Sequence, residues 1–295
     1  MSTTATWDLA EGDPITPELT AIKLLGGGNA YEAFLAFDEI TYAPVVVKVL
    51  RPDQVTDESS LRGLRREVET LALVNHPVVV RGLRHDLEGE RPHVVLEHIE
   101  GPRLSTLVRR YGPLQEQQYL PLAIDIAAAL HYLRHVEVAH LDIKPSNIIM
   151  GAPGRLLDLS VARNLDSAAA LTAQIGTDAY MAPEQADPGG RYGVPCAASD
   201  VWGLGASLFK AVTGHRPFGR AEEESARLEE RYPQLVQNVS PLPAETPGEV
   251  VKALHACLER QPTNRPLPHE LSDLLAPVVE RLPRARLSSK LRGSS

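Results

Sequence analysis

The hydrophobic pattern of the chain changes character once, close to Gly101. Before that glycine, short runs rich in apolar and β-branched residues lie between turn-forming residues, as strands require. The strands predicted there are Ala33–Phe37, Val45–Leu50 and His93–Leu96, with one helix between them at Leu61–Val74. After Gly101 apolar residues recur at helical spacing. The helices predicted there are Leu120–Leu133, Val201–Val212, Glu222–Arg231 and Glu249–Arg260. This order predicts an α+β fold of two lobes, the first β-rich and the second mainly helical.

The composition argues against several kinds of protein, among them nucleic-acid-binding and disulfide-rich proteins. The chain has 295 residues, enough for two lobes, and only 5% of them are aromatic, so the core must consist mainly of Leu, Val, Ile and Ala. A formal net charge of −8 argues against nucleic acid as the main partner. The two cysteines, Cys196 and Cys257, have neither metal-ligand spacing nor a disulfide framework, which indicates a reducing compartment.

We expect a cytoplasmic chain with no membrane span, either by itself or as the cytosolic part of a longer protein. The most apolar predicted helix, Leu120–Leu133, is interrupted by Asp125 and His131. Met1–Pro17 is polar and acidic, lacks the layout of a signal peptide, and is predicted to be flexible. The basic residues of the last segment are Arg281, Arg284, Arg286, Lys290 and Arg292. They indicate a solvated linker, with a patch for acidic partners or a membrane surface as the alternative.

A glycine cluster lies between two predicted strand regions. Gly26, Gly27 and Gly28 allow a tight turn and can present backbone N–H groups to an anion such as a phosphate. Taken alone, the cluster is equally consistent with a hairpin turn that binds nothing. It departs from the G-x-G-x-x-G pattern because Tyr31 stands at the third glycine position. The tyrosine side chain must then lie under or over any bound phosphates.

Lys48 lies inside an apolar strand, where a charge is costly to bury without a partner. By itself it could simply point outward from a half-exposed strand. Glu67, on the following predicted helix, changes that interpretation. If this helix packs on the strand, Glu67 can pair with Lys48 and leave the ammonium group available to phosphates.

The most specific segment is His140–Asn147. It offers a carboxylate (Asp142), a lysine two residues later (Lys144) and an amide oxygen (Asn147), which suit proton abstraction, phosphate contact and a hard cation. Eleven residues after Asn147, Asp158 follows an apolar pair and can supply a second carboxylate to the cation. A lone Asp in a loop is usually a turn former, but four suitable groups in this order make that interpretation improbable.

With these residues in place, the chain resembles the eukaryotic-like Ser/Thr protein kinases, in particular the bacterial branch, over about Ile22–Leu275. Besides the segment around Asp142, the resemblance rests on Gly176–Glu184, Ser199–Gly205 and Gln261–Pro266. It implies a bilobal protein-kinase-like fold with ATP between the lobes, and a structural ion pair between Glu184 and Arg265. The implied division is a flexible N-terminus at 1–17, an N-lobe at 18–97, a C-lobe at 98–280 and a basic tail or linker at 281–295.

The resemblance also implies roles for residues around the nucleotide. Lys48 would hold the α- and β-phosphates and Glu67 would pair with it. Leu96 would be the gatekeeper residue at the back of the adenine pocket. The backbone groups of Glu97 and Ile99, in the predicted hinge segment Glu97–Gly101, would hydrogen-bond the adenine.

For the transfer step, the resemblance makes Asp142 the catalytic base and Lys144 a phosphate contact. Asn147 and Asp158 would bind Mg²⁺ or Mn²⁺. Lys144 followed by Pro-Ser-Asn is similar to the Ser/Thr version of this loop, and Thr177 is similar to the threonine of the substrate-binding loop. The expected partners are therefore ATP and a protein that carries serine or threonine.

Several positions depart from the family pattern. Leu159 and Ser160 replace the Phe-Gly that usually follows the metal-binding aspartate, and a serine there is expected to restrict flipping of that segment. Leu141 replaces an arginine that reads an activation-loop phosphate in many relatives. Val46 stands where alanine is usual under the adenine, so we expect a tighter pocket.

The sequence therefore predicts an ATP-dependent Ser/Thr protein kinase, with autophosphorylation as a further activity of the same site. The alternative is a pseudokinase, a regulatory module that binds nucleotide or a partner with little turnover, which the departures at Tyr31, Leu141, Leu159 and Ser160 favour. A small-molecule kinase of related fold is a third hypothesis, opposed by the Gly176–Glu184 stretch. The oligomeric state and the physiological substrate stay open.

Overall fold

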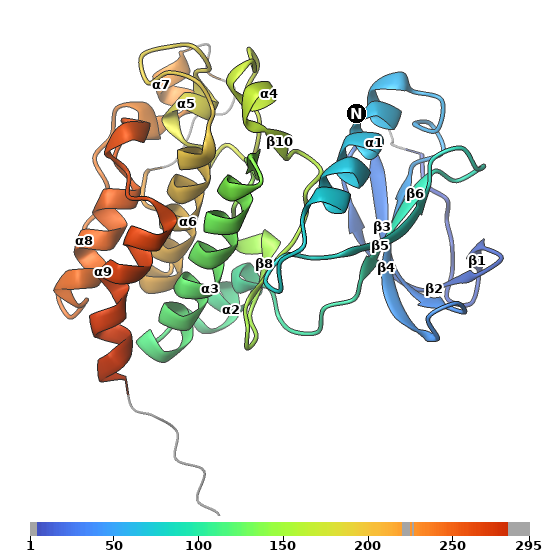
Figure 1. Ribbon diagram of the computed structural model, residues 1–295, viewed down its shortest axis with the longest axis horizontal. Coiled ribbons are helices and arrows are strands. Elements are labelled where there is room, and N and C mark those ends of the chain that lie inside the picture. Colours follow the sequence, from blue (N-terminus) through green and yellow to red (C-terminus); the bar gives the residue numbers. More distant parts are fainter. Residues whose placement is uncertain (1–4, 220–224, 226, 283–295) are drawn as a thin grey trace, which may run out of the picture.

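A six-stranded antiparallel sheet forms the first of two lobes in the computed structural model of the chain (Figure 1). The structure describes residues 5–219, 225 and 227–282. The strand order is β1-β2-β3-β4-β6-β5. The strands are β1 (Pro14–Thr16), β2 (Leu19–Gly27), β3 (Tyr31–Asp38), β4 (Ala43–Leu50), β5 (Gly82–Asp86) and β6 (His93–Glu97). The three strands predicted from the sequence are confirmed as β3, β4 and β6, each slightly longer than predicted.

Because side chains alternate along a strand, the two faces of this sheet carry different residues and contact different parts of the molecule. Phe34, Val45 and Val47 lie on the outer face and belong to a small buried cluster. Val46 and Lys48, which alternate with the outward-facing valines along β4, face the other lobe and line a cleft. The alternation thus aims the one lysine of β4 into the cleft.

The sheet begins earlier in the chain than the predicted lobe boundary at residue 18. Pro14–Thr16 pairs with β2, and Ile15 is buried in the outer cluster. This strand therefore lies inside the segment 1–17 that the sequence analysis assigned to a flexible N-terminus. A three-residue strand that begins with Pro14 and is followed by Pro17 is too short to produce an alternating pattern, so no periodic signal predicts it.

The helix predicted at Leu61–Val74 is confirmed as α1 (Glu58–Leu73). Asp57 caps it, because its carboxylate accepts a hydrogen bond of 2.7 Å from the backbone N–H of Ser60. Leu64 and Leu71 are buried in the main core, and Glu67 shares their face at helical spacing. Packing of the leucines therefore turns Glu67 inward.

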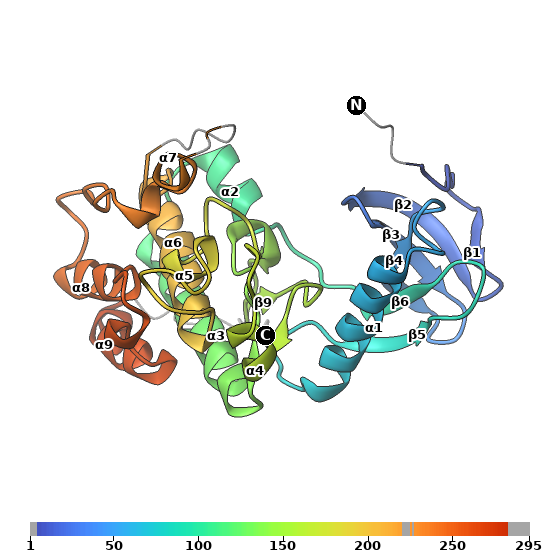
Figure 2. The same cartoon turned by 90° about the horizontal axis from the view of Figure 1, so that it is seen from above.

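The second lobe is mainly helical and lies beside the sheet lobe (Figures 1 and 2). Its helices are α2 (Leu104–Tyr111), α3 (Glu116–His135), α4 (Leu165–Ala169), α5 (Pro183–Ala186), α6 (Ala197–Thr213), α7 (Leu228–Arg231), α8 (Gly248–Cys257) and α9 (Pro268–Arg281). Two small sheets pair β7 (Val138–Ala139) with β10 (Arg163–Asn164), and β8 (Ile148–Ile149) with β9 (Arg155–Leu156). Short 3₁₀ turns are η1 (Pro145–Asn147), η2 (Pro233–Leu235) and η3 (Pro262–Asn264).

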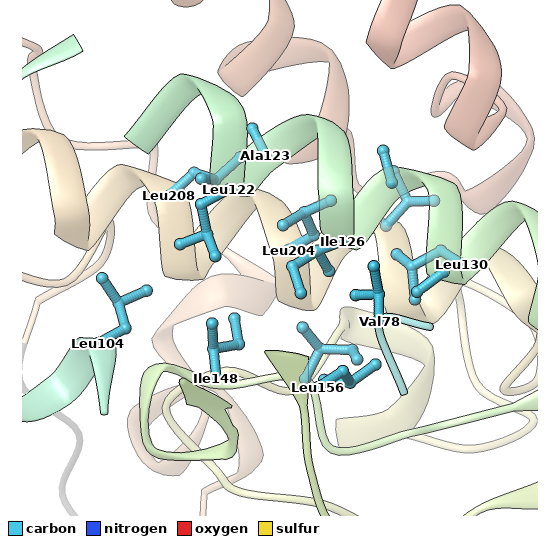
Figure 3. Packing of buried hydrophobic residues seen from close by; sticks show 14 of the residues in the cluster. Val78, Leu104, Leu122, Ala123, Ile126, Leu130, Ile148, Leu156, Leu204 and Leu208 are labelled. Carbon is cyan, nitrogen blue, oxygen red and sulfur yellow. The ribbon is translucent and has the colours of Figure 1, made fainter. Parts of the chain in front are cut away.

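The core of this lobe forms where α3 packs on α6, and it continues to the strands that carry the cleft residues. Ile126 of α3 and Leu204 of α6 belong to the same buried cluster as Ile148 and Leu156, which begin β8 and end β9 (Figure 3). Leu104 of α2 closes one end of the cluster. The apolar core therefore fixes the segments on either side of the predicted catalytic loop.

The predicted helices of this lobe are found with shifted ends. Leu120–Leu133 lies inside the longer α3, and Val201–Val212 lies inside α6. The helix predicted at Glu249–Arg260 is α8, which ends at Cys257. Of the helix predicted at Glu222–Arg231, residues 222–224 and 226 lie outside the described residues and the remainder contains α7. Among the described helices, none is long and apolar enough to cross a membrane.

Of the predicted basic tail, Arg281 ends α9 and pairs with Glu249 at 2.9 Å. Arg284, Arg286, Lys290 and Arg292 lie outside the described residues.

The structure contains the ion pair between Glu184 and Arg265. Both side chains are fully buried, and the guanidinium donates two parallel hydrogen bonds of 2.6 and 2.8 Å to the carboxylate. Arg265 also donates to three backbone carbonyls, so its charge is fully hydrogen-bonded inside the lobe.

We predict that Arg265→Met destabilises the protein by about 3–5 kcal/mol, because it leaves the Glu184 carboxylate buried without its cation. The matched control is Arg281→Met, which breaks the exposed pair with Glu249 and should cost less than about 1 kcal/mol. Urea unfolding at pH 7 measures both. Equal, small losses in the two variants would contradict the structural role of the buried pair.

Candidate active site

A cleft of about 630 Å³ lies between the two lobes. Twelve site residues were predicted from the sequence, and ten of them line the cleft: Gly26, Gly27, Gly28, Lys48, Leu96, Glu97, Ile99, Lys144, Asn147 and Asp158. The other two, Glu67 and Asp142, lie just outside its lining and contact residues that belong to it. The structure thus gathers the predicted set at one place.

The cleft has apolar walls from both lobes. Ala33 of β3 and Val46 of β4 lie on the sheet side, while Ile149 of β8 and Leu157 lie on the helical side. Such a slot fits a flat heterocycle. Sequence reasoning singled out Val46 but missed the other three. The signal that could have found Ile149 and Leu157 is the position of their apolar pairs, one just after and one just before the predicted metal ligands.

Lys48 lies between two carboxylates. Its ammonium is 2.6 Å from Glu67 Oε1 and 2.6 Å from Asp158 Oδ1, and only 15% of its side chain is exposed. Burial alone would lower the pKa of Lys48, but the two neighbouring charges outweigh it and raise this pKa above its usual value. Lys48 therefore stays charged over the whole physiological range.

The two carboxylates are affected in opposite directions. Burial would raise the pKa of Asp158, but the attraction of Lys48 is stronger, so this pKa lies well below its usual range. The pKa of Glu67 is raised, chiefly by burial and further by the charge of Asp158. Glu67 is also the more buried partner, and its Oε2 has no hydrogen-bond partner among the described residues. One cation shared by two anions accounts for this asymmetry.

A second cluster forms around Asp142. Lys144 Nζ lies 2.6 Å from Asp142 Oδ2 and donates a 2.7 Å hydrogen bond to Thr177 Oγ1. The Thr177 hydroxyl in turn donates to Asp142 Oδ1 at 2.7 Å. Asn147 Nδ2 donates to both the side chain and the backbone carbonyl of Asp142. The carboxylate is thereby fixed in orientation at the mouth of the cleft.

The backbone of this loop is held by a residue whose role the sequence analysis missed. Asp200, buried near the start of α6, accepts hydrogen bonds of 2.7 Å from the N–H groups of His140 and Leu141. Leu141 has φ = 63°, a conformation that costs a bulky residue energy and persists only where the surroundings impose it. Asp200 supplies that constraint. An aspartate flanked by the apolar stretch of a buried helix was the available signal.

The donor set fits a hard cation. Asn147 lines the cleft and uses its NH₂ group toward Asp142, so its carbonyl oxygen is not needed for those two hydrogen bonds. Asp158 uses Oδ1 toward Lys48, and 31% of its side chain is exposed. One carboxylate and one amide oxygen are too few to hold Mg²⁺ alone, and no group of three or more His, Cys, Asp or Glu side chains among the described residues could do so. Such a site requires oxygen ligands from a phosphate.

Tyr31 does not block the cleft. Its ring lies beside Lys48, with the ammonium 6.0 Å from the ring centroid. Its hydroxyl reaches α1, where a Cβ added at Gly63 would lie only 3.2 Å away. Burial, followed by the charge of Glu67, raises the pKa of Tyr31 to about 12, so the hydroxyl is neutral. The absence of a side chain at Gly63 thus makes room for the tyrosine.

The other departures are accommodated locally. Leu141 is buried against Ala139 and Ala168, where an arginine head group would be costly. Asp158, at φ = 68°, is the residue of its segment with left-handed backbone, and Ser160 does not need positive φ. The expected restriction on flipping of this segment stays a prediction.

In the hinge segment, the side chain of Glu97 is held by contacts with Arg81 and Arg155. It accepts a 2.8 Å hydrogen bond from the backbone N–H of Arg81 and pairs with Arg155 of β9. The backbone groups of Glu97 and Ile99 stay beside the cleft.

Comparison with known proteins agrees with this arrangement. A family model described as the protein kinase domain matches residues 19–275. The chain is similar to the serine/threonine-protein kinase PknB of Mycobacterium leprae, with 35% identity over 204 residues, 66% of this chain and 32% of that protein. It is similar to the probable serine/threonine-protein kinase PkwA of Thermomonospora curvata, with 35% identity over 270 residues, 89% of this chain and 34% of that protein.

A further relative is the serine/threonine-protein kinase PrkC of Bacillus subtilis, with 30% identity over 245 residues, 77% of this chain and 37% of that protein. The chain thus spans about a third of the length of the curated relatives that it matches.

We predict that Lys48→Met destabilises the protein at pH 7 by about 2–4 kcal/mol, because Glu67 and Asp158 are left without a cation. The loss should shrink as the pH falls toward about 4. The variant regains stability there as its carboxylates, now with raised pKa values, take up protons. The lowered pKa of Asp158 stabilises the wild type at neutral pH. This contribution to the free energy of unfolding is lost as the pH falls below the pKa of an aspartate in the unfolded chain.

Urea unfolding between pH 4 and pH 7 measures this difference. The control is Lys23→Met, the same substitution on the exposed side of β2, whose effect should be small at every pH. A loss for Lys48→Met that does not vary with pH would contradict the ion-pair assignment.

Proposed function

Because the chain belongs to the protein kinase family, we propose that it transfers the γ-phosphoryl group of ATP to serine and threonine hydroxyls of proteins. The observation that carries this proposal is the cluster of Asp142, Lys144 and Thr177, joined by contacts of 2.6–2.7 Å beside the cleft that contains Lys48 and Asp158. A fixed carboxylate next to cationic groups is what a hydroxyl needs in order to attack a phosphoryl group.

ATP binds in the cleft with its adenine between Val46 and Leu157, in front of Leu96. The backbone of Glu97 and Ile99 hydrogen-bonds the adenine edge. The phosphates lie under the glycine-rich loop, Leu25–Tyr31. Lys48 of β4 contacts the α- and β-phosphates. Support for this placement comes from the cleft lining and from the position of Lys48.

In the transfer step the hydroxyl oxygen of the substrate forms a bond to the γ-phosphorus, and the bond from the γ-phosphorus to the β–γ bridging oxygen breaks. The hydroxyl proton passes to Asp142. Lys144 stabilises the negative charge on the transferring group, and Thr177 keeps both side chains in place. Positioning and charge neutralisation account for the catalysis, because no covalent enzyme intermediate is needed.

We propose Asn147 and Asp158 as the ligands of the divalent cation that protein kinases use, Mg²⁺ or Mn²⁺, because both cations take oxygen donors. When bound, this cation neutralises phosphate charge and stabilises the leaving ADP. Asn147 also orients Asp142 through its NH₂ group, so it links the metal site to the base.

Serine and threonine are favoured as acceptors by the segment Lys144-Pro-Ser-Asn and by the contact of Lys144 with Thr177. Nothing in the described residues favours the alternative of a binding module without turnover, since Lys48, Asp142 and Asp158 are all held in their places. We propose that the domain acts in the cytoplasm, where ATP is supplied and where its two free cysteines stay reduced.

We predict that Asp142→Asn abolishes phosphoryl transfer while ATP affinity changes less than about threefold, because the proton acceptor is lost and Asp142 does not line the nucleotide cleft. The assay incubates the protein with Mg·ATP and a generic basic protein. Intact-mass and peptide mass spectrometry then identify the phosphorylated residues.

The control is Asp166→Asn, an exposed position on α4 that should keep wild-type activity. Phosphate on serine or threonine in the wild type and this control alone would support the proposal. Transfer by Asp142→Asn within a few-fold of the wild-type rate would remove Asp142 as the base.

We predict that Asp158→Asn reduces the gain in ATP affinity that Mg²⁺ provides by about tenfold, equivalent to 1.4 kcal/mol. Metal-free ATP should bind the variant at least as well as the wild type, because Lys48 loses a competing anion. Calorimetric titrations with ATP, in Mg²⁺ and in EDTA, measure both quantities. An unchanged Mg²⁺ dependence would remove Asp158 from the metal site.

A further inference from the structure

Residues 5–9 form an N-terminal strap against the outer face of the sheet, on the side away from the cleft. The chain enters beside the sheet of the first lobe (Figure 2). Trp7 and Leu9 pack against the outer apolar cluster. The guanidinium of Arg91 lies 4.7 Å from the centroid of the Trp7 ring.

The strap is bound by directed hydrogen bonds as well as by packing. The Trp7 backbone N–H donates to Glu32 Oε2 at 2.9 Å, and its indole N–H donates to the Leu50 carbonyl at 2.7 Å. Glu32 is only 2% exposed. A buried carboxylate needs donors, and the strap supplies one of them. Glu32 is also the second residue of β3, directly after the glycine-rich loop Leu25–Tyr31.

Arg51 connects this strap to the loop. Its Nε donates to the Gly28 carbonyl at 2.8 Å, and its Nη1 donates to the Ala5 carbonyl at 3.1 Å. The same Nη1 lies 3.7 Å from Glu32 Oε1. Its backbone N–H donates to the Ala30 carbonyl at 2.9 Å. One residue at the end of β4 therefore contacts the loop twice and the strap once.

The contact with Gly28 sets the orientation of a peptide group. In a planar trans peptide the carbonyl and the following N–H point in opposite directions. Since Arg51 holds the Gly28 carbonyl, the N–H of Asn29 points away from the guanidinium. Gly28 lines the cleft, whereas Arg51 and the strap do not. The carbonyl that could repel a phosphate is thus held by the guanidinium, and the N–H of Asn29 stays free of this contact on the opposite side of the peptide.

The hydrogen bond from Arg51 restrains the part of the glycine-rich loop whose backbone is otherwise least restricted. Gly26 has φ = 140°, and three consecutive glycines allow many conformations that present carbonyls to the cleft. Fixing one peptide in the anion-binding orientation before ATP arrives removes part of the ordering cost of binding.

We propose that Arg51 is a positioning residue for ATP, and that the N-terminal strap, through Ala5 and Glu32, keeps its guanidinium on the Gly28 carbonyl. The proposal rests on the proposed function in that the loop is taken to bind the phosphates. Arg51 acts on the loop and does not touch the nucleotide.

The test compares Arg51→Met, a chain lacking residues 2–8, and the combination of the two. In the nucleotide-free proteins, hydrogen exchange of the amides in the glycine-rich loop should be at least about fivefold faster in each variant than in the wild type. The KM for ATP should rise about five- to tenfold, with kcat within about twofold. The combination should be no worse than Arg51→Met alone, because both changes remove one shared contact.

Two further variants separate positioning from a general loss of structure. Arg51→Lys keeps the charge without the planar fork and should fall between the wild type and Arg51→Met. Arg109→Met, on the exposed side of α2, is the matched control and should leave loop exchange and KM unchanged.

Unchanged loop exchange and unchanged ATP affinity in Arg51→Met would overturn the proposal. Fully additive effects of Arg51→Met and the deletion would overturn the part assigned to the strap. A wild-type chain that binds ATP without transferring phosphate would defeat the proposed function and leave the affinity comparison valid. A wild-type chain that does not bind ATP would overturn both.

Discussion

One ammonium group shared by two carboxylates connects the three parts of the molecule on which the site depends. Lys48 belongs to the sheet, Glu67 to the helix packed on it, and Asp158 to the other lobe. Two negative charges against one positive charge leave the triad with an unbalanced anion, which a further cation would neutralise. The triad is therefore adapted to a ligand that brings both phosphates and metal, and its geometry fixes the distance between the lobes at the cleft.

The catalytic loop depends on a different constraint, which comes from inside the helical lobe. Asp200 is buried in α6 and holds two consecutive N–H groups of a loop that would otherwise relax from the strained conformation at Leu141. The core between α3 and α6 keeps this aspartate in place. Precision at Asp142 is thus maintained by apolar packing that lies well away from the cleft.

Much of the site was predictable from the sequence because its chemistry is local. The spacing of Asp142, Lys144 and Asn147 specifies a donor set within one loop, and period-two alternation aims Lys48 inward. The apolar wall residue Ala33 could not be recognised, since nothing distinguishes it from a core residue until the lobes are placed together.

The N-terminal region shows most clearly which contacts cannot be predicted from the sequence. Its polar composition predicted flexibility, yet Trp7 and Ala5 bond to groups 25 to 46 residues later in the chain. Single hydrogen bonds between distant polar groups leave no periodic pattern in a sequence. For the same reason Arg51 was not recognised, although its neighbour three positions earlier was.

The long sequence separation within the lysine triad has a consequence for synthesis on the ribosome. Glu67 follows Lys48 by 19 residues, but Asp158 follows it by 110. A first lobe that folds as it emerges has a one-to-one pair of charges at Lys48 and is electrically balanced there. The second carboxylate arrives only when the catalytic loop has been made. The nascent sheet can thus fold as a neutral unit, and it acquires its excess negative charge when the rest of the site becomes available to use it.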